Sequence, residues 1–570
     1  MGFLGTRDTV GSDVRAGLTL GVQSVPDGLA TGLLAGVNPA YGLYAYLVGT
    51  AAGALATSSV LMSVQATGAM SVIVADVPML HDGPQAASAL FTLSVLTGVV
   101  MVALGLLRLG TLVRFVPNAV LTGFVNAVAV NIVLGQFSNL TGYSSDGGNR
   151  VTRSIDTLLH PLQWSWPSVL VGVLTVALIL LLERTPVGAL GLVVAVVATS
   201  AGAALLGIDG VKTLDDVAQV PSTLPSLSLP DLGLVSGLLV PALSLALVGL
   251  VQGAAISNAI PNPDGRYPDA SGDFRGQGVA NIAAGMLQGM PVGGSMSATA
   301  IVTAAGARSR LANITASVVM ALLILLVGPA LGHIAMPALA ALLMLIGVRT
   351  FKLENVLNVW RTGPTQATTM AVTFVLTLLI PLQYAVLVGV GLSILLHVFS
   401  QSSKVTLVSW EADEQGRLVE GPVPAELPPD DVVVLQPYGS LFFAAAPVLE
   451  SQLPQVTPRS TGSVVVLRLR GKQELGSTFI GVVRRYAAEL EAVGSRLHLA
   501  GVSEGVLRQL DATGTTAALG PDAVFPATRV VHESLDQAVA AARAFTGGAP
   551  DSRGTDGGGT DGGGRVPPPG

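Results

Sequence analysis

The chain has 570 residues, of which 50% are hydrophobic and only 11% are charged. Soluble domains carry about a quarter charged residues, so this composition indicates a membrane protein. The chain contains no cysteine, which excludes disulfide frameworks, thiolate metal sites and cysteine nucleophiles. The net charge of −6 argues against a nucleic-acid partner, because phosphate binding needs clustered Lys and Arg.

Charge-free tracts punctuated by Gly and Pro predict fourteen membrane-spanning segments. In chain order we place them at 14–36, 41–60, 62–76, 86–107, 113–136, 166–183, 187–207, 234–256, 276–290, 295–306, 311–332, 336–348, 364–380 and 383–400. Two of them, 62–76 and 295–306, are too short to cross a hydrocarbon core of about 30 Å. The first is the third of the first seven predicted segments, and the second is the third of the second seven. Such a pair predicts a seven-plus-seven inverted repeat with the substrate site between the halves.

The stretch from Phe274 to Arg308 is apolar enough for a membrane but is interrupted halfway by Pro291 and several glycines. A helix that starts in the middle of the bilayer has unpaired N–H groups, which are tolerated only where they face a cavity or a ligand. Small and hydroxyl-bearing residues in membrane helices more often contribute to helix packing than to ligand binding. Here they lie at the starts of two short segments, and this position favours a role in substrate binding. The candidate substrate-binding residues are Gln65, Thr67, Gly68, Ala69, Gly294, Ser295, Ser297, Ala298 and Thr299.

Lys and Arg in the loops predict the orientation of the chain in the membrane. If the N-terminus is cytoplasmic, the outside loops carry only Arg150, Arg153 and Lys212, and every other loop Lys or Arg up to Lys404 lies inside. An even number of spans then places the C-terminus inside as well. The sequence therefore predicts a multi-pass protein of the cell (inner) membrane with both termini cytoplasmic.

From Lys404 onward the sequence resembles that of a soluble domain. Apolar runs predict buried strands at 432–435 and 464–469, and amphipathic patterns predict helices at 479–493 and 534–545. The region 547–570 is rich in Gly, Asp, Thr and Pro, so we expect it to be disordered. The predicted domains are residues 1–403 (transmembrane), 404–546 (α/β) and 547–570 (tail).

Three groups of residues match a known family pattern. They are Asp13-Val-Arg-Ala-Gly-Leu-Thr19 with Pro26, Ala35-Gly36-Val37, Pro39 and Gly42-Leu43-Tyr44; Phe115-Val-Pro117 with Gly123-Phe124 and Gln136; and Gly276-Gln-Gly278, Ala280-Asn281, Gly285, Gly289, Pro291, Gly294-Ser295, Ser297 and Ala305-Gly306-Ala307-Arg308. The chain thus resembles the SulP sulfate-permease family of anion transporters, and its C-terminal part resembles the cytoplasmic STAS domain of that family. The resemblance implies a core domain that moves against a gate domain, and a homodimer.

Three positions depart from the family pattern. Many members have Pro-Gln where this chain has Pro26-Asp27, an acidic residue where it has Gln252, and Ser-Arg where it has Ser297-Ala298. Asp27 is the only Asp, Glu, Lys or Arg between Arg15 and Asp76, and such a carboxylate is costly unless it is protonated or faces water. Asp27 and Gln252 are therefore candidates for ion coupling. The alternative for Asp27 is a capped break of the first helix beside Pro26.

The function that fits these features is secondary transport of a small anion of the sulfate, bicarbonate or dicarboxylate class by alternating access. H⁺ or Na⁺ is the candidate coupling ion, and we expect no cofactor, no metal and no catalysed reaction, because nucleotide-binding, metal-binding and nucleophile motifs are missing. One alternative is proton-coupled uptake of a neutral or weakly acidic solute such as a nucleobase. Another, of a different class, is a membrane-anchored STAS sensor or scaffold without transport.

Overall fold

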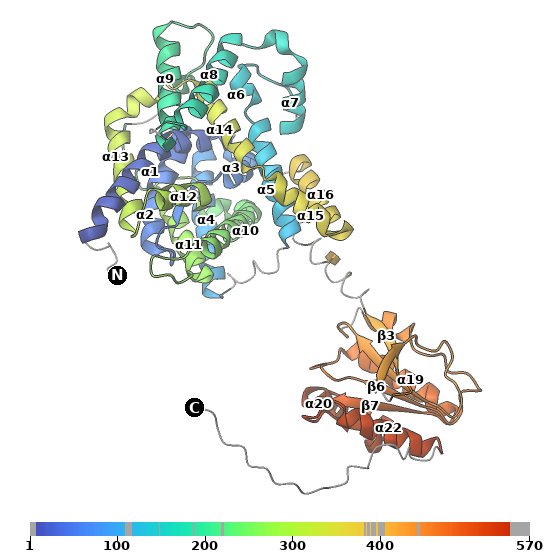
Figure 1. Cartoon of the computed structure of the whole chain (residues 1–570). Coiled ribbons are helices and arrows are strands. Elements are labelled where there is room, and N and C mark those ends of the chain that lie inside the picture. Colours follow the sequence, from blue (N-terminus) through green and yellow to red (C-terminus); the bar gives the residue numbers. More distant parts are fainter. Residues whose placement is uncertain are drawn as a thin grey trace, which may run out of the picture. The chain divides into compact units, whose positions relative to one another are not determined.

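The computed structural model describes residues 7–380 and 405–547 except 82, 109–116, 148, 186–187, 218–221, 416 and 442–444, together with 384, 388, 391, 395, 396 and 399. The chain forms two compact units, Met1–Ile394 and Leu395–Gly570 (Figure 1). The predicted span 383–400, the predicted boundary after residue 403 and the predicted tail fall largely outside the described residues.

The first unit is helical. Its helices are α1 (Arg7–Leu34), α2 (Pro39–Ala56), α3 (Gly68–Ala75), α4 (Ala86–Leu106), α5 (Asn118–Leu134), α6 (Phe137–Thr141), α7 (Arg150–Leu159), α8 (Trp166–Leu182), α9 (Gly191–Leu205), α10 (Val235–Ala259), α11 (Ala270–Met286), α12 (Met296–Ala304), α13 (Leu311–Leu331), α14 (Met336–Thr350), α15 (Leu353–Thr362) and α16 (Pro364–Leu379). A helix lies at each predicted span before 383–400. Among the described residues, the stretches long and apolar enough to cross a membrane number five: 86–106, 118–141, 232–259, 311–331 and 336–362. The count of fourteen spans therefore stays a prediction.

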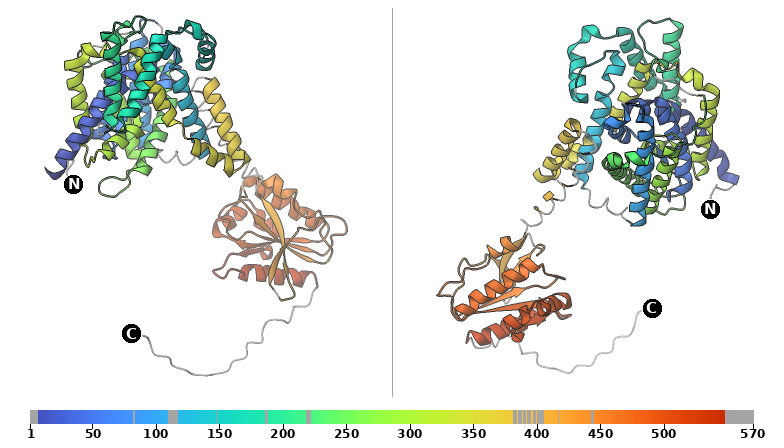
Figure 2. Two further views of the ribbon diagram at one scale, coloured as in Figure 1. Left: turned by 45° about the horizontal axis from the view of Figure 1, so that its top comes forward. Right: turned by 180° about the vertical axis from the view of Figure 1, so that it is seen from behind.

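The helices pack into two groups. The α1 group contains α1 to α4 and α10 to α13, and the α5 group contains α5 to α9 and α14 to α16. Within the α1 group, α1 and α13 lie side by side (Figures 1 and 2). Helices α1 and α2 touch through their backbones, since a Cβ on Gly42 would lie 2.2 Å from the Gly28 carbonyl oxygen. The two groups meet where α3 packs on α5 and where α1 packs on α9 and α14.

Helix α1 runs without a break from Arg7 to Leu34 with Pro26 inside it. The expectation of a capped break beside Asp27 is therefore wrong. Proline removes one backbone hydrogen bond, but in membrane helices neighbouring groups can satisfy the freed carbonyl, so a proline alone does not end the helix.

Both predicted short segments consist of a three-residue strand followed by a short helix. Strand β1 (Ser63–Gln65) precedes α3, and β2 (Gly293–Ser295) precedes α12. The two strands pair antiparallel, with Ser63 opposite Ser295 and Gln65 opposite Gly293. This pairing brings together the starts of two helices that lie more than two hundred residues apart in the chain.

The second unit is a six-stranded sheet covered by helices. The strands are β3 (Thr406–Ala412), β4 (Leu418–Gly421), β5 (Val432–Tyr438), β6 (Val464–Arg468), β7 (Arg496–Val502) and β8 (Val524–Pro526), in the order β4-β3-β5-β6-β7-β8. Strands β5 to β8 are parallel, and β3 and β4 are antiparallel. The helices are α18 (Ala446–Glu450), α19 (Ser477–Ala492), α20 (Glu504–Ala512), α21 (Thr515–Leu519) and α22 (Glu533–Phe545).

Two apolar clusters of the second unit lie on opposite faces of its sheet, as the alternation of side chains along each strand requires. One contains Val465, Leu467 and residues of α19, and the other contains Val464, Val466 and residues of α22 (Figure 2). The predicted segments 432–435, 464–469, 479–493 and 534–545 correspond to β5, β6, α19 and α22, which confirms the α/β assignment.

Candidate functional site

The start of α3 is capped by a side chain that also reaches α10. The Thr67 hydroxyl accepts a hydrogen bond from the Met70 N–H at 3.4 Å and donates one to Gln252 Oε1 at 3.1 Å. The structure thus brings the candidate binding residue Thr67 together with the candidate coupling residue Gln252. Gly68 and Ala69 form the first turn of α3, whose uncapped N–H groups carry the positive end of the helix dipole.

The start of α12 has the same construction. Ser295 caps the helix by accepting from the Ala298 N–H at 3.3 Å, and its carbonyl accepts from the Thr299 hydroxyl at 2.6 Å. The Thr299 hydroxyl in turn accepts from the Ser63 N–H of β1 at 3.1 Å. Ser297 lies 3.2 Å from Ser295, Oγ to Oγ, on the exposed side of α12.

Side chains of α11 hold β2 in place on the side opposite β1. Gln277 Oε1 accepts from the Gly294 N–H at 2.9 Å. The Asn281 amide accepts from the Val292 N–H at 2.9 Å and donates to the Val292 carbonyl at 2.6 Å. These amides replace the backbone of a further strand, so β2 has hydrogen-bonding partners on both sides. Gln277 and Asn281 were not among the predicted site residues, although two amides within a run of small apolar residues were a usable signal.

Gln65 differs from the other predicted binding residues. Its amide donates to the Ser24 hydroxyl at 3.0 Å and to the Thr50 hydroxyl at 3.2 Å, and the side chain is buried. The donors of Gln65 therefore join β1 to α1 and α2. Asp27 lies one turn beyond Ser24 on α1, and its Oδ1 is buried without a hydrogen-bond partner in the described part of the chain.

Two buried carboxylates anchor the loops next to the half-helices. Asp273 accepts from the Ser59 N–H at 2.6 Å and from the Ser257 hydroxyl at 2.6 Å, ahead of β1. Asp13 accepts from the Arg308 N–H at 2.6 Å and from the Ser309 hydroxyl at 2.7 Å, beyond α12. Ionised acceptors make stronger hydrogen bonds than neutral ones, so these contacts fix the residues before β1 and those after α12.

The field around the helix starts comes from backbone dipoles, because none of the residues of β1, α3, β2 and α12 is charged. Ala298 is buried where many family members carry arginine. Each helix N-terminus contributes roughly half an elementary positive charge. The arrangement can therefore hold a small anion or a polar acceptor group between two N-termini without a side-chain cation.

A helical membrane unit built around two paired half-helices, joined to an α/β domain with a mixed sheet, defines a multi-pass membrane transporter with a C-terminal STAS domain. The family signature described as "Sulfate permease family" matches residues 10–373, and that of the STAS domain matches residues 427–529. The chain belongs to the sulfate permease family.

Relatives share this family and this fold. The "Probable sulfate transporter MT1781" of Mycobacterium tuberculosis is 29% identical over 388 residues, covering 67% of this chain and 69% of that protein. The "Putative sulfate transporter YbaR" of Bacillus subtilis is 28% identical over 410 residues, covering 71% and 80%. The murine Slc26a9 anion transporter, in an inward-facing state, superposes with a TM-score of 0.82 at 18% identity over 95% of this chain and 92% of that one. The transmembrane domain of the cyanobacterial bicarbonate transporter BicA superposes with a TM-score of 0.57 at 20% identity, over 69% of this chain and 98% of that one.

Proposed function

We propose that this protein is a secondary transporter of a small anion, of the sulfate, bicarbonate or dicarboxylate class. The observation that carries the proposal is the pairing of β1 with β2, which brings the starts of α3 and α12, and with them the positive ends of both helix dipoles, close together. Relatives bearing the names sulfate and bicarbonate transporter support the anion class. Movement of the α1 group against the α5 group would expose these helix starts to each side of the membrane in turn.

The remaining parts of the proposal concern assembly and topology. We infer that the protein has fourteen spans in two inverted halves and lies in the plasma membrane with both termini in the cytoplasm. We also infer that it forms a homodimer. The distribution of Lys and Arg in the loops supports the orientation, and the family resemblance supports the repeat and the dimer. The transport cycle needs no cofactor, metal or covalent step.

The substrate site of the proposal consists of the first N–H groups of α3 and α12 and of nearby hydroxyl groups. Thr67 and Ser295 cap the two helices, and Gly68, Ala69 and Ala298 are small residues in the first turns, beside the N–H groups that the caps do not use. Thr299 and Gly294 position this surface, and Ser297 extends it on the exposed side. Gln65 supports it from behind through α1 and α2.

One observation favours a second candidate, proton-coupled uptake of a neutral or weakly acidic solute such as a nucleobase. Asp27 carries a buried oxygen without a partner among the described residues, and Ala298 leaves the site without a cation. A carboxyl group in this setting can take up and release a proton during the cycle. A sensor or scaffold without transport is less well supported, because a mere anchor does not need polar caps on two half-helices.

Uptake by the purified protein in proteoliposomes tests the proposal. We expect accumulation of at least one of sulfate, bicarbonate and a dicarboxylate, and competition among anions of that class. Uptake of a nucleobase but of no anion would favour the second candidate, and no uptake of either kind under any gradient of H⁺ or Na⁺ would contradict transport.

The variant Gly68→Val tests the placement of the site. A Cβ on residue 68 would lie 2.7 Å from Ile132 Cδ1, so a larger side chain crowds the contact of α3 with α5. We expect uptake to fall about tenfold, because the added side chain lies beside the first N–H groups of α3, and a loss of about 1.4 kcal/mol of binding free energy corresponds to a factor of ten. The matched control is Gly202→Val on α9, where a Cβ meets no atom within 4 Å. Equal uptake by both variants would contradict the placement.

A further inference from the structure

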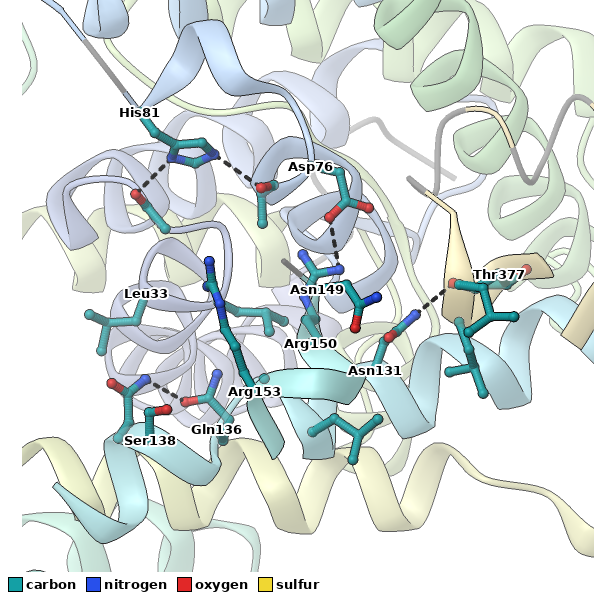
Figure 3. Close-up of a pocket in the computed structure, with 18 of the residues that line it drawn as sticks. Leu33, Asp76, His81, Asn131, Gln136, Ser138, Asn149, Arg150, Arg153 and Thr377 are labelled. Carbon is teal, nitrogen blue, oxygen red and sulfur yellow. Dashed lines mark hydrogen bonds and ion pairs between the residues drawn. The ribbon is translucent and has the colours of Figure 1, made fainter. Parts of the chain in front are cut away.

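A cleft lies at the far end of α3 from the candidate site, between the α1 group and the α5 group. Its volume is about 790 Å³, and its walls come from the C-terminal ends of α1, α3 and α5, the first turn of α7, and the end of α16. Figure 3 shows Arg150 and Arg153 entering it from α7, with Asp76, His81, Asn131 and Gln136 around them. We call this space the α7 cleft. On the orientation proposed above it opens to the outside.

The α7 cleft carries a net positive charge. Of the lining residues that the structure describes, Arg150 and Arg153 are cationic and Asp76 is the only carboxylate. Arg153 uses its Nε to donate to the Gly147 carbonyl at 3.0 Å, which leaves the two terminal nitrogens of its guanidinium as donors. The first turn of α7 faces the same space and adds the positive end of a ten-residue helix.

Helix C-termini would oppose an anion here, but their carbonyl groups already have polar neighbours. The ring nitrogens of His81 lie 3.1 Å from the Gly36 and Ala75 carbonyl oxygens. Ser154 donates to the Leu134 carbonyl at 3.0 Å. Gln136 accepts from Asn139 through its side-chain oxygen at 3.0 Å, so its N–H groups remain as donors.

Arg150 connects the two helix groups across the α7 cleft. Its Nη1 lies 2.9 Å from Asp76 Oδ1, and its Nη2 donates to the Val72 carbonyl at 3.3 Å, both at the C-terminal end of α3. Asp76 stands at the negative end of the α3 dipole, so Arg150 offsets an unfavourable charge. An oxyanion that enters the cleft can take the place of Asp76 as the partner of Arg150, because the planar guanidinium binds two oxygens of an oxyanion as well as it binds a carboxylate.

We propose that the α7 cleft is a second anion site, which binds a small oxyanion between Arg150 and Arg153 in competition with Asp76 before the anion reaches the half-helices. The anion belongs to the sulfate, bicarbonate or dicarboxylate class of the proposed function. The role of this site in transport rests on that proposed function, whereas anion binding at the site does not. An anion bound here weakens the ion pair of Arg150 with Asp76, which is one of the contacts between the α5 group and the α1 group.

Arginine modification of the full-length protein in lipid nanodiscs tests binding without transport. Phenylglyoxal is applied in sulfate or in gluconate at equal ionic strength, and peptide mapping gives the modification rate at Arg153. We expect sulfate to slow modification of Arg153 in a saturable way, by roughly two- to fivefold for a partly exposed charged site. Arg184, exposed after the end of α8 away from α7, is the internal control and should show no protection. Equal rates at Arg153 in sulfate and gluconate overturn the proposal.

Two variants give effects of opposite sign. Asp76→Asn removes the competing carboxylate, so it should lower the sulfate concentration for half-protection of Arg153 by roughly two- to fivefold. Arg153→Gln should raise the KM for uptake by a similar factor with Vmax unchanged, and Arg153→Lys, which keeps the charge, should restore it. An unchanged half-protecting concentration in Asp76→Asn overturns the competition. Protection of Arg153 by sulfate without any sulfate uptake would support anion binding in the α7 cleft and contradict sulfate transport. Sulfate uptake without protection of Arg153 would support transport and contradict binding in the α7 cleft.

Discussion

Asp27 stands out among the single residues of the membrane unit. A carboxylate that keeps its charge inside a membrane normally has a cation or several N–H donors beside it, whereas Oδ1 of Asp27 has no partner within the described structure. Gln23, one turn earlier on α1, also has a buried side-chain oxygen without a described partner. A proton on Asp27 turns one of its oxygens from a hydrogen-bond acceptor into a donor and removes the buried charge. Proton coupling needs a carboxyl group of this kind, which can take up a proton inside the membrane unit.

The substitution Asp27→Asn separates coupling from structure. Asparagine keeps the shape and much of the hydrogen bonding but does not titrate, so we expect the variant to bind substrate while its uptake no longer responds to an imposed pH gradient. Proteoliposomes with internal and external pH set separately provide the measurement. Asp209→Asn, at an exposed loop position, is the control that removes a carboxylate without this effect. A wild type that ignores the pH gradient, or a variant that responds as the wild type does, would leave Asp27 with a structural role only.

The half-helices are the elements on which the site depends, and their stability comes from side chains of α11. Without Gln277 and Asn281, the N–H groups of Val292 and Gly294 would lose the acceptors that the structure gives them. Three-residue strands are too short to hold a register by themselves, so the amides of α11 support β2, while Asp273 holds the residues before β1 and Asp13 holds those after α12.

The variant Gln277→Leu should destabilise β2 and the start of α12. It has similar volume but leaves the Gly294 N–H without its acceptor, which costs about 1–3 kcal/mol for a buried donor. We expect a lower Tm for the detergent-solubilised protein and faster hydrogen exchange in peptides covering residues 292–300. Gln85→Leu, at an exposed cap without a side-chain hydrogen bond, should leave both measurements unchanged. Exchange in 292–300 that matches the wild type would show that α11 does not hold the strand.

The whole molecule consists of two units with separate apolar cores. The sheet of the second unit is covered on both faces by its own helices, and the half-helices with their partners belong to the first unit. The parts that would bind substrate therefore have no hydrogen-bonding partner among the described residues of the STAS unit. All of the candidate site residues belong to the first unit, and we propose that the STAS unit adjusts transport and does not form the site.

A chain ending at residue 403 tests this division. Because all of the candidate site residues lie in the first unit, we expect the truncated protein to retain substrate affinity within about a factor of two, as for independent regions of a protein. Binding is measured on the purified truncate and on the full chain, and uptake rates are compared separately, since rate and assembly are free to change. Loss of binding by a truncate that remains folded and monodisperse would place part of the site in the STAS unit.

The amino-acid sequence by itself determined the membrane class, the positions of the helices up to α16 other than α6, α7 and α15, the two interrupted segments and the α/β character of the second unit. These features depend on local properties: the length of apolar runs, the placement of Gly and Pro, and side-chain periodicity. Thr67, Gly68, Ser295 and Ala298 were recognisable as helix starts for the same reason.

Only the tertiary structure decided which groups meet. The antiparallel pairing of Ser63 with Ser295, the support of β2 by Gln277, and the ion pair of Arg150 with Asp76 join segments that are distant in sequence or lie in different helix groups. No local sequence pattern identifies such partners. The residues next to Gln277 or Arg150 in the chain do not reveal which distant residue each side chain contacts in the folded protein. The continuation of α1 through Pro26 was decided in the same way, since surrounding helices and not the proline itself determine whether a membrane helix ends.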